Sequence, residues 1–168
     1  MATNYGSLHY MEYKNAATYR IAALFVIGNI ALPQLCHLVP SGGPMLLPIY
    51  FFTLVAAYKY GWKVGVLTAV ASPLVNSALF AMPAPAVLPA ILTKSLLLAA
   101  AAGFAARKFR RVSLLLLLGV VLFYQVIGSA AEWALTGSLS AAMQDFRIGI
   151  PGMLLQILGG YLFIKYLK

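Results

Sequence analysis

One stretch of the chain, Gly42–Lys94, decides the fold; it reads GGPMLLPIYFFTLVAAYKYGWKVGVLTAVASPLVNSALFAMPAPAVLPAILTK. Two apolar runs in it are joined by a short basic turn, KYGWK at residues 59–63. The next turn, AMPAP at residues 81–85, carries no charge and leads into a third apolar run. Lysine and arginine are retained on the cytoplasmic side of a membrane. The alternation therefore predicts membrane-spanning helices, with the basic turn inside and the uncharged turn outside.

The composition of the whole chain indicates the same class. Of its 168 residues, 62% are hydrophobic and 9% are charged, and the mean hydropathy is +0.90. Soluble domains carry about 25% charged residues, and a helix needs about 20 apolar residues to cross a bilayer. The sequence therefore predicts an all-α integral membrane protein, with a single transmembrane domain over residues 1–168.

Extending the pattern both ways predicts a six-helix transmembrane bundle with both termini cytoplasmic. The expected spans are about 18–38, 45–58, 62–80, 85–106, 112–135 and 148–167. On the other side we expect Arg147, balanced by Asp145, while Lys94 falls within a span. The remaining basic residues all fall on the expected cytoplasmic side: Lys14, Arg20, Lys59, Lys63, Arg107, Lys108, Arg110, Arg111, Lys165 and Lys168.

Charge and cysteine usage exclude several other classes. The net charge of +9 is explained by basic turns on one side of a membrane, so no nucleic-acid partner is expected. The polar start, MATNYGSLHYMEYKNAATYR, lacks the pattern of a cleavable signal peptide and is expected to be a cytoplasmic tail. The single cysteine, Cys36, excludes an internal disulfide.

Motifs for catalysis are missing from the sequence. It contains neither the GxxxxGK[ST] phosphate loop nor the HExxH zinc motif, and it has three acidic residues in all. We therefore expect no enzyme, no cofactor of its own and no metal. Cys36 and His37 are adjacent soft ligands, which by themselves are a weak metal signal but leave haem ligation open.

Polar side chains within the apolar spans indicate a candidate pocket. Lys94, Gln125 and Gln156 lie nine or ten residues from the outer ends of their spans, at about the same depth of 14 Å. Such residues are costly in lipid and face an interior or a cavity. The predicted substrate-binding residues are Lys94, Gln125, Glu132, Gln156, Asn76, Trp133, Arg147 and His37.

A second interpretation of these residues stays open. They could serve only as hydrogen bonds between helices, with Lys94 paired to Glu132 or extended toward the interface. If they line a pocket, Lys94 and Arg147 favour a ligand with a carboxylate or phosphate, because each can donate a charge-assisted hydrogen bond. Aromatic side chains such as Trp133 and Tyr50 could stack on a ring of the ligand.

Several short motifs occur in an order that is similar to one known family. They are Leu47-Pro48-Ile49, Ala56-Ala57-Tyr58-Lys59-Tyr60-Gly61, Gly65, Ser72-Pro73-Leu74, Met82-Pro83 and Pro89. In this order they resemble the second to fourth spans of the substrate-binding S components of energy-coupling factor (ECF) vitamin transporters. The motifs cover about residues 18–110, and the rest of the chain is similar only in its pattern of spans.

The resemblance implies a multi-pass protein of the bacterial cytoplasmic (inner) membrane that captures a vitamin or cofactor precursor from outside. It further implies delivery together with a transmembrane coupling subunit and two ATPases, which hydrolyse the ATP. One departure concerns docking, because Ala22, Ala23, Gly28 and Ala31 do not form the family's alanine-xxx-alanine motif. Alternatives are an S component specific for haem or another tetrapyrrole, a structural subunit of a membrane complex without transport, and, third, a membrane enzyme.

Overall fold

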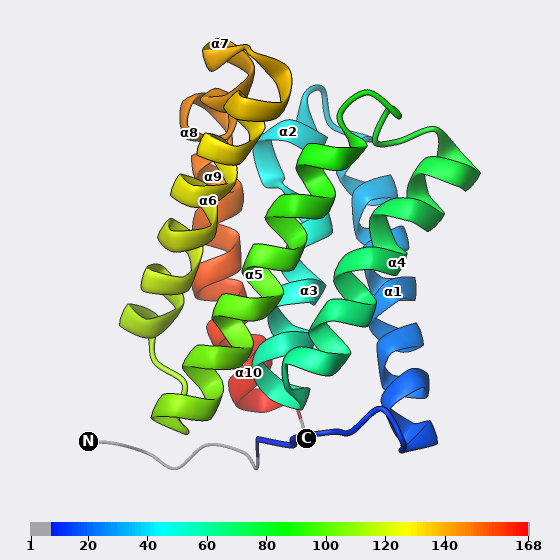
Figure 1. The fold of residues 1–168 in the computed structure, drawn as a ribbon, viewed down its shortest axis with the longest axis vertical. Coiled ribbons are helices and arrows are strands. Elements are labelled where there is room, and N and C mark those ends of the chain that lie inside the picture. The colour runs from blue at the N-terminus through cyan, green and yellow to red at the C-terminus, as the bar shows by residue number, and fades with distance from the viewer. Residues whose placement is uncertain (1–7, 168) are drawn as a thin grey trace.

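The computed structural model describes residues 8–167, and every regular element in that range is helical (Figure 1). The all-α prediction is therefore confirmed for the described part of the chain. The first seven residues of the expected tail and Lys168 lie outside it. The elements are α1 (Ala16–Cys36), α2 (Gly42–Leu46), α3 (Pro48–Tyr60), α4 (Trp62–Phe80), α5 (Leu88–Phe109), α6 (Leu114–Thr136), α7 (Leu139–Ala142), α8 (Gln144–Ile148), α9 (Ile150–Leu154), the π-helical segment η1 (Leu155–Gly159) and α10 (Gly160–Tyr166).

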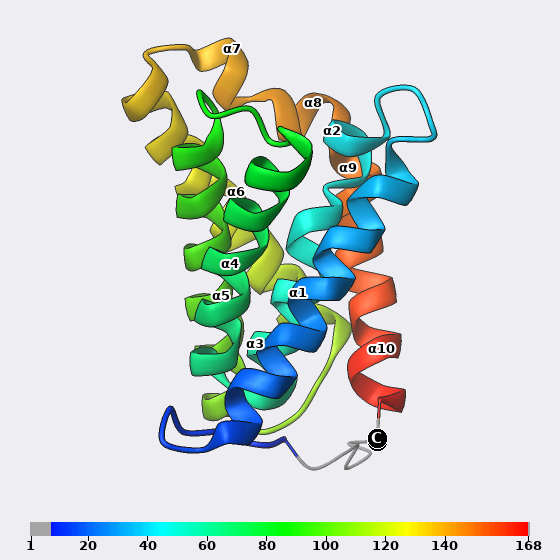
Figure 2. The same ribbon diagram turned by 90° about the vertical axis from the view of Figure 1, so that its right-hand side faces the viewer.

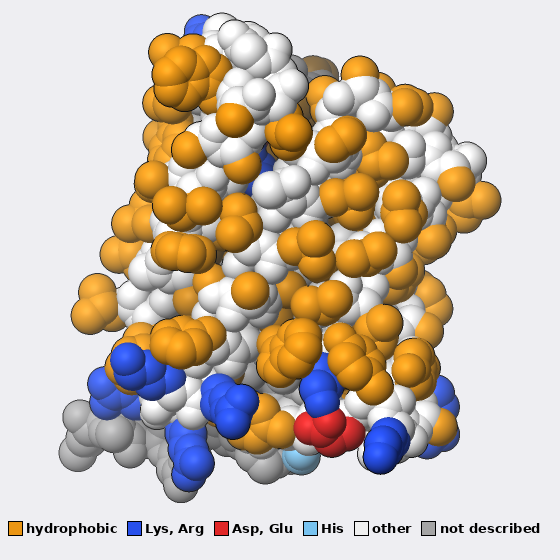
Figure 3. Space-filling model, viewed as in Figure 1, with side chains coloured by type: hydrophobic (Ala, Val, Ile, Leu, Met, Phe, Trp, Pro, Cys, Tyr) orange, Lys and Arg blue, Asp and Glu red, His pale blue; other side chains and the backbone are white. Residues whose placement is uncertain are grey.

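Four of these helices, α1, α4, α5 and α6, are long and apolar enough to cross a membrane. The continuous segment Ile150–Tyr166 is a shorter apolar helix, and α3 has 13 residues. Large apolar side chains cover the flanks, whereas lysine and arginine gather at the lower end in Figure 3. Soluble proteins rarely expose apolar surface on this scale, so helices and surface are compatible with a membrane-embedded protein. Examples of such exposed side chains are Leu24 (65%), Leu115 (77%) and Leu158 (52%).

The short helix α3 lies at the centre of the bundle, packed against α1, α4 and α5. Leu54, Val55, Ala56 and Ala57 at its middle have no exposed surface. A helix that is apolar on all sides has no face for water, which explains its central position. Gly65 of α4 lies so close to α3 that an added Cβ would collide with Ala57.

The second and sixth expected spans are each interrupted. At the expected span 45–58, the chain breaks at Leu47, which adopts the left-handed φ of 48° between α2 and α3. Pro48 explains the break, because proline disfavours the α conformation in the residue before it. The expected span 148–167 begins as α9 at Ile150 and contains the π-helical segment η1. A π turn of this kind often accompanies a functional site.

The described chain begins and ends at the same end of the bundle (Figures 1 and 2). Lys59 is 2% exposed there, and its Nζ donates to the carbonyl oxygens of Leu167 at 2.7 Å and Ile164 at 3.4 Å. The last carbonyls of a helix lack partners within the helix and favour a cation nearby. The backbone N–H of His9 donates to the carbonyl of Lys59 at 2.8 Å. One lysine thus joins the end of α3 to the end of α10.

We predict that Lys59→Met lowers the free energy of unfolding by about 1.5–3 kcal/mol, because the α10 carbonyls lose a charged donor in a buried place. Chemical unfolding of the purified protein in detergent measures this loss. The matched control is Lys63→Met four residues later, which removes an ion pair between Lys63 and the exposed Glu12. An exposed pair contributes about 0–1 kcal/mol. Equal losses in the two variants would contradict the role given to Lys59.

Candidate functional site

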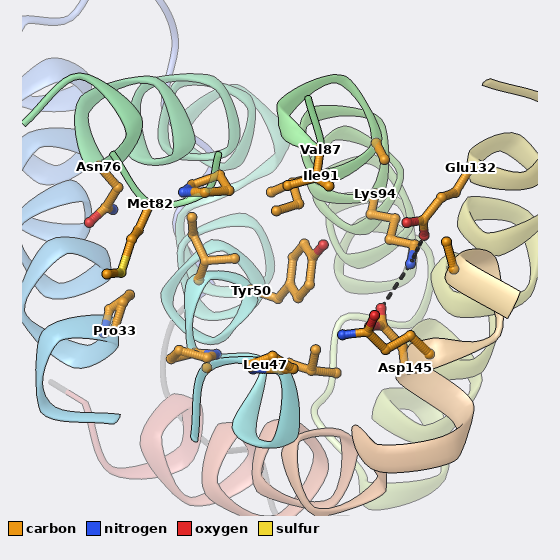
Figure 4. Close-up of a pocket in the computed structure, with 18 of the residues that line it drawn as sticks. Pro33, Leu47, Tyr50, Asn76, Met82, Val87, Ile91, Lys94, Glu132 and Asp145 are labelled. Atoms are coloured by element: carbon orange, nitrogen blue, oxygen red, sulfur yellow. Dashed lines mark hydrogen bonds and ion pairs between the residues drawn. The ribbon is translucent and has the colours of Figure 1, made fainter. Parts of the chain in front are cut away.

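A pocket of about 290 Å³ lies at the end of the bundle opposite to the two ends of the described chain. Its wall combines α2, the first turn of α3 and residues of α1, α4, α5 and α6. The short helices α7 and α8 add their residues from the outer side. Figure 4 shows the pocket as a space surrounded by segments that are far apart in the sequence.

Most of the wall is apolar, and an aromatic ring closes its inner side. Leu47, Val87 and Ile91 belong to the apolar part, and the Tyr50 ring lies between the two polar sides of the pocket in Figure 4. Tyr50 packs on Tyr124, with 5.4 Å between ring centroids. The Tyr124 hydroxyl in turn donates to Oε1 of Gln156 at 2.8 Å, in the fully buried interior. Two layers of tyrosine therefore separate the cavity from that glutamine.

One side of the pocket holds a buried lysine between two carboxylates. Lys94 Nζ lies 2.6 Å from Oε2 of Glu132 and 2.8 Å from Oδ2 of Asp145. The lysine side chain is 4% exposed, and those of its partners are 14% and 13% exposed. The three residues come from α5, α6 and α8. Burying an ammonium costs several kcal/mol unless it is paired, so this ion triad, Lys94 with Glu132 and Asp145, holds three elements together.

A glycine makes room for the lysine stem. An added Cβ on Gly128 would lie 2.5 Å from Cγ of Lys94, so the stem runs directly across α6 at this point. Glu132 lies four residues further on and therefore on the same face of α6. The bare face at Gly128 thus allows the stem to reach the carboxylate one turn away.

The opposite side of the pocket is formed by Asn76, which is 1% exposed. Its Nδ2 donates to the backbone carbonyls of Asn29 at 2.9 Å and Ser72 at 3.0 Å. Because a carbonyl can only accept, the orientation of the amide is fixed. Its Oδ1 has no hydrogen-bond partner among the described residues. Asn76 therefore has an unused acceptor, but that atom is buried and does not face the cavity.

His37 lies at the outer part of the same wall and is exposed to solvent. Its Nδ1 lies 2.6 Å from the carbonyl oxygen of Pro33. Since a carbonyl oxygen can only accept, Nδ1 carries the proton in this contact. Nε2 lies next to Gly43, another residue of the pocket wall.

The structure brings four of the predicted site residues to the pocket, namely Lys94, Glu132, Asn76 and His37. The other four do not line it. Gln156 lies behind the tyrosine layers, and Gln125 is fully buried without a hydrogen-bond partner among the described residues. Trp133 and Arg147 are exposed. The difference arises because an equal depth in neighbouring helices does not determine which way each side chain points.

Asp145 is the site residue that the sequence interpretation missed. It was expected to balance Arg147, but the described residues contain no ion pair between the two, and Asp145 instead approaches Lys94. The number and position of the acidic residues were the available signal. The chain has only three acidic residues, and two of them precede or follow the same outer loop. A buried lysine nearby can form ion pairs with both carboxylates.

Neither metal ligands nor known relatives identify the site. Within residues 8–167, no group of three or more His, Cys, Asp or Glu side chains is placed to hold a metal ion. Cys36 is buried, whereas the neighbouring His37 is exposed. No family model, curated protein or solved structure matches the chain. The functional interpretation therefore depends on the geometry of the pocket and on the sequence.

We predict that Gly128→Val destabilises the protein by about 1–3 kcal/mol, because the added atoms force the Lys94 stem off α6 and weaken its contact with Glu132. Thermal unfolding in detergent measures the change. Gly119→Val on the same helix is the control, since a Cβ there meets nothing within 4 Å. The steric explanation fails if Gly119→Val destabilises the protein as much as Gly128→Val does.

Proposed function

We propose that this chain is the substrate-binding membrane subunit of an ECF-type importer, which captures a vitamin or cofactor precursor from outside. The observation that carries this proposal is the pocket between the ends of the helices, with a buried ion triad on one side and the buried amide of Asn76 on the other. Ligand sites are concave and mostly apolar, with a few well-placed polar groups, and this pocket has that character.

The proposed topology has six spans, with both termini in the cytoplasm of a bacterium. In addition to the four long helices, α3 with α2 and the segment 150–166 would be the remaining spans. The support is the separation of charge, since basic residues gather at the end where the described chain begins and ends. With this orientation the pocket faces outward.

The proposed partners follow from what the sequence lacks. The chain has no phosphate-loop motif, so the energy for import is assigned to a coupling subunit and an ATPase pair. Binding is favoured over catalysis because Lys94, Glu132 and Asp145 are committed to each other in ion pairs. The small-molecule ligand, the partner subunits and the lipid bilayer are the expected contacts, and no nucleic acid is among them.

We predict that Ser140→Cys, in the exposed part of α7, reacts with an impermeant thiol reagent added to intact cells. Lys14→Cys at the other end should react only after the cells are opened. Both variants are made in a Cys36→Ser background, so that no native thiol contributes. The reverse pattern of labelling would overturn the proposed orientation.

We predict that the purified protein is stabilised against thermal unfolding by at least one compound in a panel of vitamins, their precursors and haem. A ligand at 100 times its dissociation constant contributes about 2.7 kcal/mol. Val87→Trp should abolish this stabilisation, because residue 87 lines the pocket and is 42% exposed, so the larger ring can enter the cavity without disturbing the core. Val126→Trp, on the outer face of α6 and 55% exposed, is the matched control.

Two results would contradict the proposal, one from that panel and one from a transport measurement in liposomes. If no compound stabilises the protein, the pocket is better explained as packing in a structural subunit. If the chain alone, reconstituted in liposomes, accumulates the ligand without ATP, the assignment of energy to partner subunits is wrong.

A further inference from the structure

The charged groups around the pocket do not cancel. Lys94 contributes one positive charge, and Glu132 and Asp145 contribute two negative charges. No other Lys, Arg, Asp or Glu lines the pocket among the described residues. Arg147 lies on α8 as well, but it is exposed and its charge is screened by water. The pocket therefore carries a net charge of −1 when these three groups are ionised and His37, which also lines it, is uncharged.

The unused hydrogen-bonding atoms of the pocket are mainly acceptors. Each carboxylate of the triad uses one oxygen on the ammonium, and no described residue donates to Glu132 Oε1 or Asp145 Oδ1. Asn76 Oδ1 also lacks a partner, but it has no accessible surface and adds no acceptor to the cavity. A buried acceptor without a donor loses about 1–3 kcal/mol relative to water. The pocket therefore favours a ligand that brings donors.

We propose that the ligand is an organic cation with N–H donors, such as an ammonium or a protonated nitrogen ring. This inference rests on the proposed function of the pocket as a ligand site. A single positive charge brings the pocket to neutrality and supplies the donors that the free carboxylate oxygens need. A ligand anion would instead place a third negative charge beside a single ammonium, in a site where water screens poorly.

This class differs from the one that Lys94 suggests by itself. A lone buried lysine favours a carboxylate or phosphate, which was the expectation from the sequence. Asp145 reverses the sign, because it gives the ammonium a second carboxylate and leaves one negative charge in excess. Aromatic and apolar walls at Tyr50, Leu47 and Ile91 fit an apolar body attached to the cation.

The experiment compares three probes of similar shape and different charge: 2-phenylethylamine as the cation, 3-phenylpropionate as the anion and 2-phenylethanol as the neutral compound. Binding to the purified full-length protein is measured near neutral pH by calorimetry and by thermal stabilisation. We expect the amine to bind about tenfold or more tightly than either of the others, as a charge-assisted hydrogen bond contributes that much.

Two substitutions change the charge of the pocket in opposite directions. Asp145→Asn removes one negative charge and should weaken binding of the amine by about tenfold or more, while it improves binding of the anion. Lys94→Met leaves two unpaired carboxylates and should tighten binding of the amine. Glu12→Gln, which removes a carboxylate at the other end of the molecule, is the control and should change neither affinity.

The outcomes separate this inference from the proposed function. Tighter binding of 3-phenylpropionate, or an amine affinity that is unchanged in Asp145→Asn, overturns the cation preference but leaves a working ligand site. If none of the three probes binds at millimolar concentration, the preference is tested by the charge of the vitamin that stabilises the protein. A neutral or anionic vitamin would overturn the cation preference. If neither probes nor vitamins bind, the proposed function fails together with it.

Discussion

The ammonium of Lys94 and its two carboxylates are the interaction on which the pocket end of this molecule depends. A charge in this position is tolerable only while it is paired, so α6 and α8 must both hold their carboxylates near α5. The short helices α7 and α8 have little apolar surface with which to fold alone. The contact between Asp145 and Lys94 therefore holds α8 beside the pocket.

The sequence predicted the helical class and the region of the pocket because both depend on local signals. Apolar runs, basic turns and uncharged turns determine where helices begin and end. Depth along a helix singled out Lys94, Gln125 and Gln156, of which only Lys94 lines the pocket. Depth does not determine azimuth, so Gln156 was placed at the same level but faces Tyr124 behind the pocket floor. Asp145 lies in a five-residue helix of a loop, where no periodic pattern indicates what it approaches.

The charge of the ligand also depends on contacts that only the folded structure determines. A lysine within an apolar span indicates an anion or a carboxylate partner, and the choice depends on how many carboxylates come within a few ångströms. That number is set by the fold of the outer loop and by Gly128, whose missing side chain lets the lysine stem cross α6. The role of the polar residues on the Asn76 side of the pocket also depends on contacts between helices. Asn29 bonds Ser72 and Asn76 between helices, and the remaining oxygen of Asn76 is buried.

The two tyrosine layers, Tyr50 and Tyr124, limit how far a molecule can enter the cavity from the pocket side. Tyr50, Tyr124 and Gln156 close the inner side in successive layers, and α3 fills the centre of the bundle below them. Tyr124, Gln156 and Leu54 have no exposed surface, so a molecule held in the cavity meets packed side chains on its inner side. If the chain is the importer subunit proposed above, transfer across the membrane would require that the whole body reorient with the bound ligand, rather than that a gate open beneath it.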